Sequence, residues 1–215
     1  MPVYLLDDDL WFPPVTAALP DGLLAVGGDL SPGRLLLAYH NGIFPWYNAD
    51  EPPMWWCPDP RFVLLPEELK VSKSMQKVIA RQEFEFKVDT AFAQVIGNCR
   101  HIYRKDQDGT WISHEVAAAY TRLHTMGYAH SAEAWQGGEL VGGLYGIRLG
   151  SVFFGESMFS RVSNASKFAF LQWVQRLRAD GVRLIDCQVH TGHLESLGAR
   201  MIPREEFVGM LGRYV

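Results

Sequence analysis

Two polar residues stand two positions apart in the apolar segment LIDCQV, residues 184–189, namely Asp186 and Gln188. Residues two apart in a β-strand project to the same face, so we expect the carboxylate and the amide to lie side by side. Such a pair can form a relay: Asp186 accepts from the Gln188 NH2 group, and the Gln188 carbonyl accepts from a third group. A polar pair that only satisfies the backbone of the following loop is the alternative, and the two residues alone do not separate these interpretations.

Glu156 is the only ionisable residue in the strand-like run VFFGESMF, residues 152–159. A carboxylate in a buried strand is costly unless it has hydrogen-bonding partners. It could be satisfied by nearby side chains, namely Ser157, Ser160, Arg161 or Lys167. Alternatively it lies on the floor of a pocket walled by Phe153 and Met158, which would select an apolar ligand group. Residues 153 and 156 face oppositely in a regular strand, so this pocket requires an irregularity, for which a bulge at Gly155 is the candidate.

Four basic residues form a stripe on a predicted helix and its approach: Lys70, Lys73, Lys77 and Arg81. Their four-residue spacing places the last three on one helix face. A row of this kind is commonly a solvated face, and the sharper interpretation is a surface that contacts the phosphate backbone of a nucleic acid.

Seven tryptophans are numerous for 215 residues, and Trp46, Trp55, Trp56 and Trp111 lie in loop-like sequence. Tryptophans in loops can stack on nucleic-acid bases or wall a pocket. Filling the core is the commoner role for any single one of them.

Cys187, His190 and His193 have the spacing C-x-x-H-x-x-H. A structural zinc site needs four ligands and a catalytic site needs three in suitable geometry, and no companion Cys/His pair accompanies this motif. We therefore expect no metal site.

From residue 61 onward, strand and helix patterns alternate. Two strand patterns, 139–149 and 151–159, meet at Gly150-Ser151 as in a hairpin, and a helix pattern from Asn164 to Gly181 leads to the strand containing Asp186. This order predicts an α/β (α+β) fold with a mixed sheet, of the acetyltransferase-like (GNAT-type) kind. We expect a small Pro- and Trp-rich N-terminal domain over residues 1–60 and an acetyltransferase-like catalytic domain over residues 61–215.

The composition restricts the class of protein. The net charge is -4, so no global basicity indicates nucleic acid, although a local basic patch is compatible with it. Three widely spaced cysteines favour a reducing cytosol over a disulfide framework. Neither a secretion signal nor a run of about 20 apolar residues is present, so we expect a cytoplasmic protein without membrane contact.

Several long motifs occur in a fixed order along the chain: GLLAVGGDL, FPWY, PMWWCPDPR, TWIS, SAEAW, ELVGGLYG, FFGESMFSRVSNASK, LIDCQVHTGHLESLGA and IPREEF. Together they resemble the bacterial leucyl/phenylalanyl-tRNA–protein transferases over nearly the whole chain from about residue 22. The resemblance implies transfer of Leu, Phe and less readily Met from aminoacyl-tRNA to the N-terminal Arg or Lys of a protein, which marks that protein for degradation. It implies neither a metal nor another cofactor, and we expect a monomer.

The resemblance also implies roles for individual residues. Trp46 and Trp111 would hold the 3′-terminal adenosine, and Asp186 with Gln188 would handle the attacking amine. The basic stripe would contact the tRNA backbone. The aminoacyl side chain would be surrounded by Glu156, Phe153, Met158, Leu144, Phe170 and Trp173. Relatives vary at positions 144, 170 and 173, which leaves the ranking of Leu, Phe and Met open.

The chemistry of the implied reaction favours positioning over proton transfer. An aminoacyl ester is already activated, and well-oriented reactants gain up to roughly 7–11 kcal/mol. Glutamine is not a base, so Asp186 and Gln188 would orient the amine and stabilise its developing charge. The proton could leave to the terminal hydroxyl of the tRNA or to water.

Two rival functions are open. An acetyl-coenzyme A N-acyltransferase would share the fold, but those enzymes place a glycine-rich loop before the core helix, where this chain has SRVSNASK, residues 160–167. A non-catalytic RNA-binding module would explain the tryptophans and the basic stripe. It would not explain an apolar pocket beside an Asp/Gln pair.

Overall fold

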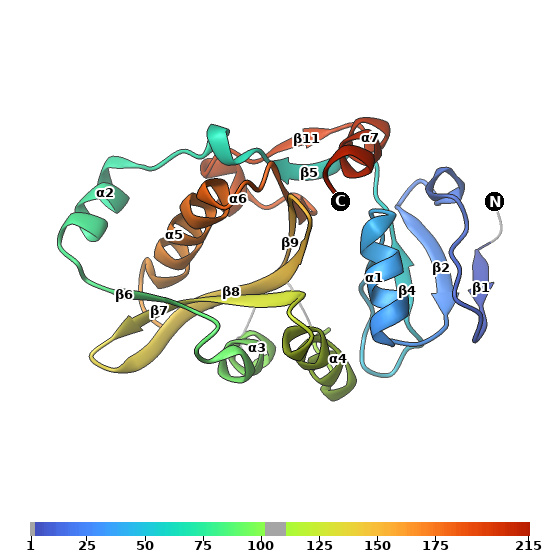
Figure 1. The fold of residues 1–215 in the computed structure, drawn as a ribbon, viewed down its shortest axis with the longest axis horizontal. Coiled ribbons are helices and arrows are strands. Elements are labelled where there is room, and N and C mark those ends of the chain that lie inside the picture. The colour runs from blue at the N-terminus through green and yellow to red at the C-terminus, as the bar shows by residue number, and fades with distance from the viewer. Residues whose placement is uncertain (1–2, 102–110) are drawn as a thin grey trace.

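Two mixed sheets organise the strands in a computed structural model that describes residues 3–101 and 111–215 (Figure 1). The smaller sheet has the order β1-β2-β4-β3, with β1 parallel to β2 and the other pairs antiparallel. Its elements are β1 (Tyr4–Leu6), the short 3-10 helix η1 (Val15–Ala17), β2 (Leu23–Gly27), α1 (Pro32–His40), β3 (Phe44–Pro45) and β4 (Met54–Trp56).

Local signals in the sequence mark both ends of helix α1. The Ser31 hydroxyl accepts from the Arg34 amide at 3.3 Å, and Pro32 occupies the first turn, where its missing N–H costs nothing. The helix stops at Asn41, and Gly42 follows with φ +73°. A Cβ at Gly42 would lie 2.7 Å from the Phe207 ring, so glycine also permits close packing of the last helix against this turn.

The larger sheet has the order β11-β5-β10-β9-β8-β7-β6. Its strands are β5 (Arg61–Leu64), β6 (Glu85–Val88), β7 (Ala129–Gln136), β8 (Glu139–Leu149), β9 (Val152–Ser160), β10 (Leu184–Gln188) and β11 (Arg200–Ile202). The helical elements are η2 (Pro66–Glu68), α2 (Lys73–Ala80), α3 (Phe92–His101), α4 (His114–Thr125), α5 (Ala165–Ala179), α6 (Gly192–Ser196) and α7 (Arg204–Tyr214).

The central part of this sheet confirms the predicted α/β class, the mixed sheet and the acetyltransferase-like order of elements. Strands β8 and β9 form the antiparallel hairpin, α5 crosses over, and β10 pairs parallel to β9. Strand β5 lies antiparallel on the other side of β10, far from it in sequence. The chain divides its strands between the two sheets after residue 56, close to the predicted domain boundary, which stays a prediction.

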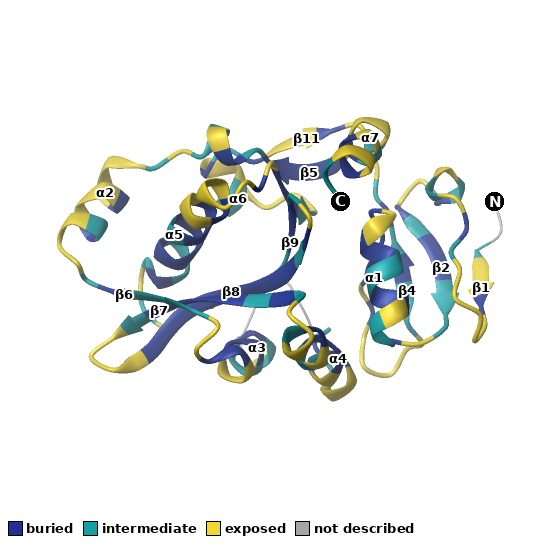
Figure 2. Ribbon diagram, in the orientation of Figure 1, coloured by how far each residue is buried: buried dark blue, intermediate teal, exposed yellow. Residues whose placement is uncertain are grey.

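Helices cover both faces of the larger sheet. Helix α5 packs on one face, and α3 and α4 pack on the other (Figure 1). Adjacent side chains of β9 point to opposite faces of the sheet. Phe153 packs on the face covered by α5, and Phe154 packs on the face covered by α3 and α4. Figure 2 shows β8, β9 and the sheet-facing side of α5 buried, whereas the exposed residues gather in loops and on outer helix faces. None of the helices in the described ranges is long and apolar enough to cross a lipid bilayer.

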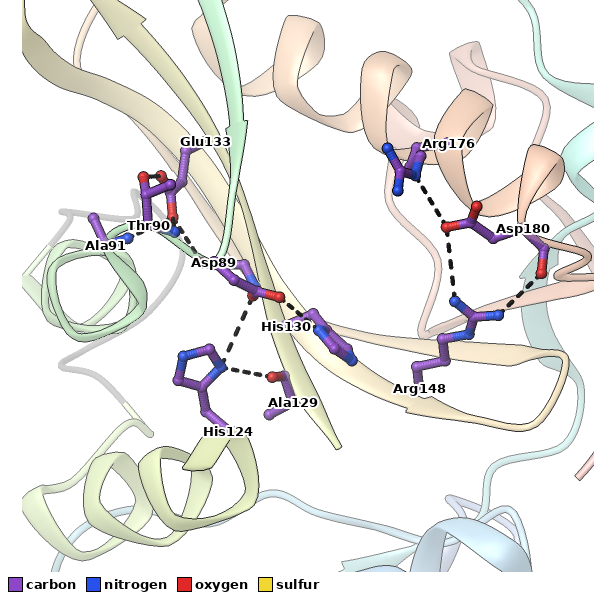
Figure 3. A network of polar contacts seen from close by, with 11 residues as sticks. Asp89, Thr90, Ala91, His124, Ala129, His130, Glu133, Arg148, Arg176 and Asp180 are labelled. Atoms are coloured by element: carbon purple, nitrogen blue, oxygen red, sulfur yellow. Dashed lines mark hydrogen bonds and ion pairs between the residues drawn. The ribbon is translucent and has the colours of Figure 1, made fainter. Parts of the chain in front are cut away.

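Two polar networks hold helices on this sheet (Figure 3). In the first, the buried Glu133 carboxylate of β7 accepts from the Thr90 and Ala91 amides at 3.0 and 2.8 Å, and from the Thr90 hydroxyl. These are donors at the start of α3, where a negative charge is favoured. In the second, Arg148 of β8 donates to the Asp180 carbonyl at 3.0 Å, which ties the end of α5 to the sheet.

Candidate functional site

A pocket of about 360 Å³ opens where strands β9 and β10 separate. The parallel pairing of these strands ends at Asp186 and Phe154, and the residues that follow in each strand line the pocket. Further walls come from β3, β8, α5 and α6. The site therefore lies at the carboxyl end of the parallel pair, the place where ligands bind in α/β sheets.

Strand β9 contains the bulge that the sequence predicts. Tyr145 pairs with Ser157 and Gly146 pairs with Gly155, which leaves Glu156 as the extra residue. A Cβ at Gly146 would lie 2.2 Å from the Phe154 carbonyl oxygen, so only glycine fits opposite the bulge. The bulge turns Glu156 into the pocket.

The Glu156 carboxylate lies on the pocket floor among hydroxyl and amide donors. The Tyr39 hydroxyl donates to Oε1 at 2.7 Å, and the Tyr120 hydroxyl donates to Oε2 at 3.0 Å. The side-chain amide of Gln188 donates to Oε1 at 3.0 Å. Burial raises the pKa of Glu156 to about 7, against the opposing effect of these hydrogen bonds. Burial and the Glu156 charge raise the pKa of both tyrosines well above its ordinary value, so they remain donors.

Asp186 is held by a residue that sequence reasoning missed, Arg61. The guanidinium donates to both carboxylate oxygens, at 2.8 and 2.7 Å, and both side chains are fully buried. Burial lowers the pKa of Arg61, but the charge and the hydrogen bonds of Asp186, with smaller effects of Cys57 and Glu156, together raise it above its ordinary value. Arg61, Tyr39 and Tyr120 come from elements far from residues 152–189 in the sequence, so no local pattern marks them as part of the site.

The predicted side-chain relay from Gln188 to Asp186 is not formed. The Gln188 side chain donates to Glu156, and its backbone N–H donates to Asp186 Oδ1 at 2.9 Å. The reason is an irregularity in β10 between residues 186 and 188, where Gln188 has φ +63° and the simple two-residue alternation fails.

The structure brings together most of the residues singled out from the sequence. Those that line the pocket are Trp46, Trp111, Leu144, Glu156, Met158, Phe170, Asp186 and Gln188. Phe153 and Trp173 are absent from this lining, and their rings pack edge to face in the core, 5.5 Å apart.

The tryptophans divide between the two roles considered for them. Trp46 is 40% exposed and contacts the Trp56 ring, and Trp111 is half-buried in the pocket wall. Trp55 is completely buried and donates to the Gly27 carbonyl at 2.9 Å, which is a core role.

Comparison with known proteins shows the family. Residues 63–212 match the family model described as leucyl/phenylalanyl-tRNA protein transferase, and residues 28–59 match the model of its N-terminal domain. The chain belongs to this family. The expectation drawn from the sequence motifs is confirmed, and the family is neither that of the coenzyme A-dependent acetyltransferases nor that of a non-catalytic RNA-binding module.

Curated members of the transferase family align over almost their full length. The protein named leucyl/phenylalanyl-tRNA–protein transferase from Nitrosospira multiformis is 58% identical over 94% of this chain and 88% of its own. The proteins of the same name from Flavobacterium johnsoniae and Syntrophobacter fumaroxidans are 55% and 54% identical, over 97% and 100% of this chain and 99% and 92% of their own. A GCN5-related N-acetyltransferase structure from Kribbella flavida overlaps weakly, with TM-score 0.38 and 11% identity over 80% of this chain and 61% of that one.

The basic stripe of this transferase lies outside the pocket. Lys73 and Lys77 are exposed on α2, whose Met75 and Val78 are buried, and Lys70 and Arg81 are exposed at its two ends. Helix α2 packs beside α5 at the end of the molecule away from the smaller sheet (Figure 1).

The transferase's Cys–His motif is dispersed. The His190 Nε2 atom lies 3.2 Å from Glu195, whereas His193 lines the pocket, and burial lowers its pKa. Within residues 3–101 and 111–215, no group of three His, Cys, Asp or Glu side chains is arranged to hold a metal ion.

Proposed function

We propose that this transferase moves Leu, Phe and less readily Met from aminoacyl-tRNA to the N-terminal α-amine of proteins that begin with Arg or Lys. The new peptide bond would mark the acceptor for degradation. The observation that carries the proposal is the apolar pocket with the Glu156 carboxylate on its floor, flanked by Trp46 and Trp111 and bordered by Gln188.

The donor side of the pocket suits an apolar side chain attached to a nucleoside. Leu144, Met158 and Phe170 supply flexible or aromatic apolar walls. The exposed Trp46 ring offers a face for the terminal adenine, and such a stacked base is worth about 1–3 kcal/mol. Residues 144 and 170 are then expected to set the ranking of the donors.

The acceptor side of the pocket suits a cation. Asp186 and Glu156 are the acids in the lining, and the Asp186 charge is paired with Arg61. Glu156 instead accepts hydrogen bonds from two tyrosine hydroxyls and one amide, none of which carries a positive charge. The resemblance places Glu156 around the aminoacyl side chain; from these contacts we propose that its ionised form attracts the positively charged N-terminal residue of an acceptor instead.

The reaction requires little beyond orientation. The α-amine, with an ordinary pKa of about 7.7–8.0, attacks the ester carbonyl carbon after losing one proton. The new C–N bond forms, the ester C–O bond breaks, and the ribose oxygen leaves with a proton as the terminal hydroxyl. The Gln188 side-chain carbonyl, with its NH2 group bound to Glu156, would accept a hydrogen bond from the amine and aim it.

Incubation with labelled Phe-tRNA and a peptide beginning with Arg tests this function. We expect label in the Arg peptide and none in a matched peptide beginning with Ala. Equal labelling of both peptides would contradict the acceptor assignment, and labelling of neither would contradict the transfer itself. We also expect the enzyme to be cytoplasmic and to work as a monomer.

A further inference from the structure

Arg61 occupies an aromatic cage behind the pocket. Its guanidinium carbon lies 4.7 Å from the centre of the Phe44 ring and 4.6 Å from the centre of the Phe207 ring. These rings come from β3 of the smaller sheet and from the last helix, α7. Cation–π contacts gain strength when water is excluded, and Arg61 is fully buried. Two distant parts of the chain thus fix one cation.

Hydrogen bonds engage both oxygens of the Asp186 carboxylate. Both oxygens accept from the Arg61 guanidinium, and Oδ1 also accepts from the backbone N–H of Gln188. An arginine keeps its charge in a protein, so the guanidinium stays a donor to Asp186. Both carboxylate oxygens are therefore engaged by donors that belong to the fold.

Gln188 needs an anchor of this kind. Its φ of +63° lies in the left-handed region. That region is strained for a residue other than glycine and persists only where surrounding contacts enforce it. The bond from the Gln188 N–H to Asp186 is such a contact, and the resulting backbone directs the side-chain amide to Glu156.

We propose that Arg61 is a positioning residue, which with Phe44 and Phe207 locks Asp186 as the anchor of Gln188 rather than as a proton acceptor. The inference rests on the proposed function, because it assigns Gln188 the task of aiming the amine. It also gives the smaller sheet and the last helix a defined part in the reaction.

The test replaces the buried pair by apolar residues of similar size, R61M with D186L. Such replacements of a buried ion pair frequently preserve folding. We expect kcat for Phe transfer to an Arg peptide to fall about 100-fold, as displacement of an aligned group by about 1 Å can do. The KM for Phe-tRNA and the shape of the pH–rate profile should stay as in the wild type, since Asp186 takes no proton. The matched control is R34M, because Arg34 is equally buried but bonds to the carbonyls of Asp7 and Asp9 instead.

Hydrogen exchange of the Gln188 backbone N–H, followed by NMR, gives a second measurement that does not depend on activity. We expect the amide to be protected in the wild type and in R34M, and to lose protection in the double variant and in the milder F207L. Wild-type kcat in the double variant, or retained protection in F207L, would overturn the proposal, as would loss of one limb of the pH profile. An inactive wild type with a protected Gln188 amide would instead count against the proposed function alone.

Discussion

Glu156 is an acid whose surroundings favour its neutral form. Burial raises its pKa from an ordinary 4.5 to about 7 in the folded chain. Between these two values the unfolded chain loses the proton while the folded chain keeps it. The folded state then binds more protons, and stability falls as the pH rises across this window. The pocket floor therefore holds a group that changes charge near neutral pH.

The free energy of unfolding should change with pH as Glu156 titrates. Raising the pH from 4.5 to 7 is expected to cost about 3 kcal/mol through Glu156, and the loss should level off above pH 7. Urea unfolding of the wild type and of E156Q at several pH values measures it, and E156Q should show a flatter profile by that amount. The control is E139Q, because Glu139 is exposed and its removal should leave the profile unchanged. Parallel profiles for wild type and E156Q would contradict the assigned titration.

Asp186 should be far more important for folding than an ordinary acid in an ion pair. D186A leaves the fully buried Arg61 without its partner, which we expect to cost about 3–5 kcal/mol. The comparison is D180A, which breaks the exposed pairs of Asp180 with Arg148 and Arg176 and should cost at most about 1 kcal/mol. Denaturant titration of both variants decides the matter. Equal destabilisation by D186A and D180A would show that the buried ion pair contributes no more to stability than the exposed ones.

The site was only partly predictable at this scale. Glu156 and the Asp186–Gln188 pair stand out because charged and amide groups are rare inside apolar strands. Their partners Tyr39, Tyr120 and Arg61 do not, because each lies in a separate helix or strand and meets the pocket only after folding. The direction of the Gln188 side chain depends on a local φ of +63°, which no residue-type pattern encodes for glutamine.

Strand β9 shows how an irregular element can be foreseen. The bulge was inferred from placing Phe153 and Glu156 on one pocket wall, and Gly155 marked its approximate place. The irregularity is present, with Glu156 as the extra residue, but Phe153 stays in the core. The fold order was predictable for a related reason: strand and helix periods in residues 61–215 are clear, and Ser72, Ser113 and Thr191 are local N-cap signals. The pairing of β5 with β10 was not, since it joins segments more than 100 residues apart.

The bulge should tolerate no side chain on its partner strand. In G146A the new Cβ would lie 2.2 Å from the Phe154 carbonyl oxygen and 2.5 Å from the Phe153 ring. We expect a destabilisation of at least about 1–3 kcal/mol, the usual cost of overpacking. The control is G209A in α7, where nothing lies within 4 Å and alanine should stabilise the helix by up to about 1 kcal/mol. Thermal unfolding of the two variants should give shifts of opposite sign.

Helix α2 can be tested as a tRNA-binding element. K73E combined with K77E should weaken binding of Phe-tRNA, and the slope of log affinity against log salt should fall by about 0.7–0.9 for each phosphate that the protein no longer neutralises. Filter binding across a salt series measures both quantities. The control is R178E with R213E, an equal change of net charge at exposed positions on other helices. If both pairs weaken binding alike, the effect is one of net charge and α2 is only a solvated face.

At the scale of the whole molecule, the smaller sheet forms part of the pocket. Its strand β3 contributes Phe44 to the pocket lining and to the cage around Arg61, Trp46 follows directly in the chain and also lines the pocket, and helix α1 places Tyr39 against Glu156. One apolar core includes residues of both sheets and of the helices between them, such as Trp55, Tyr120 and Phe207. A unit that shares its core and its site with the larger sheet should not unfold independently of it.

The turn at Gly42 is where this coupling can be probed. In G42A the new Cβ would lie 2.7 Å from the Phe207 ring at φ +73°, so both strain and a clash oppose it. The control, G127A, has φ +84° with nothing within 4 Å, and should cost only the backbone strain of about 1–2 kcal/mol. We expect G42A to cost more and to lower the stability of both sheets together, as measured by hydrogen exchange of peptides from β4 and β8 across a denaturant series. If the β4 peptide opened at lower denaturant while β8 stayed at its wild-type stability, the two sheets would be separate folding units.

Because Gly42 packs against the same Phe207 ring that cages Arg61, we also expect G42A, unlike G127A, to lower kcat under conditions where the enzyme is fully folded.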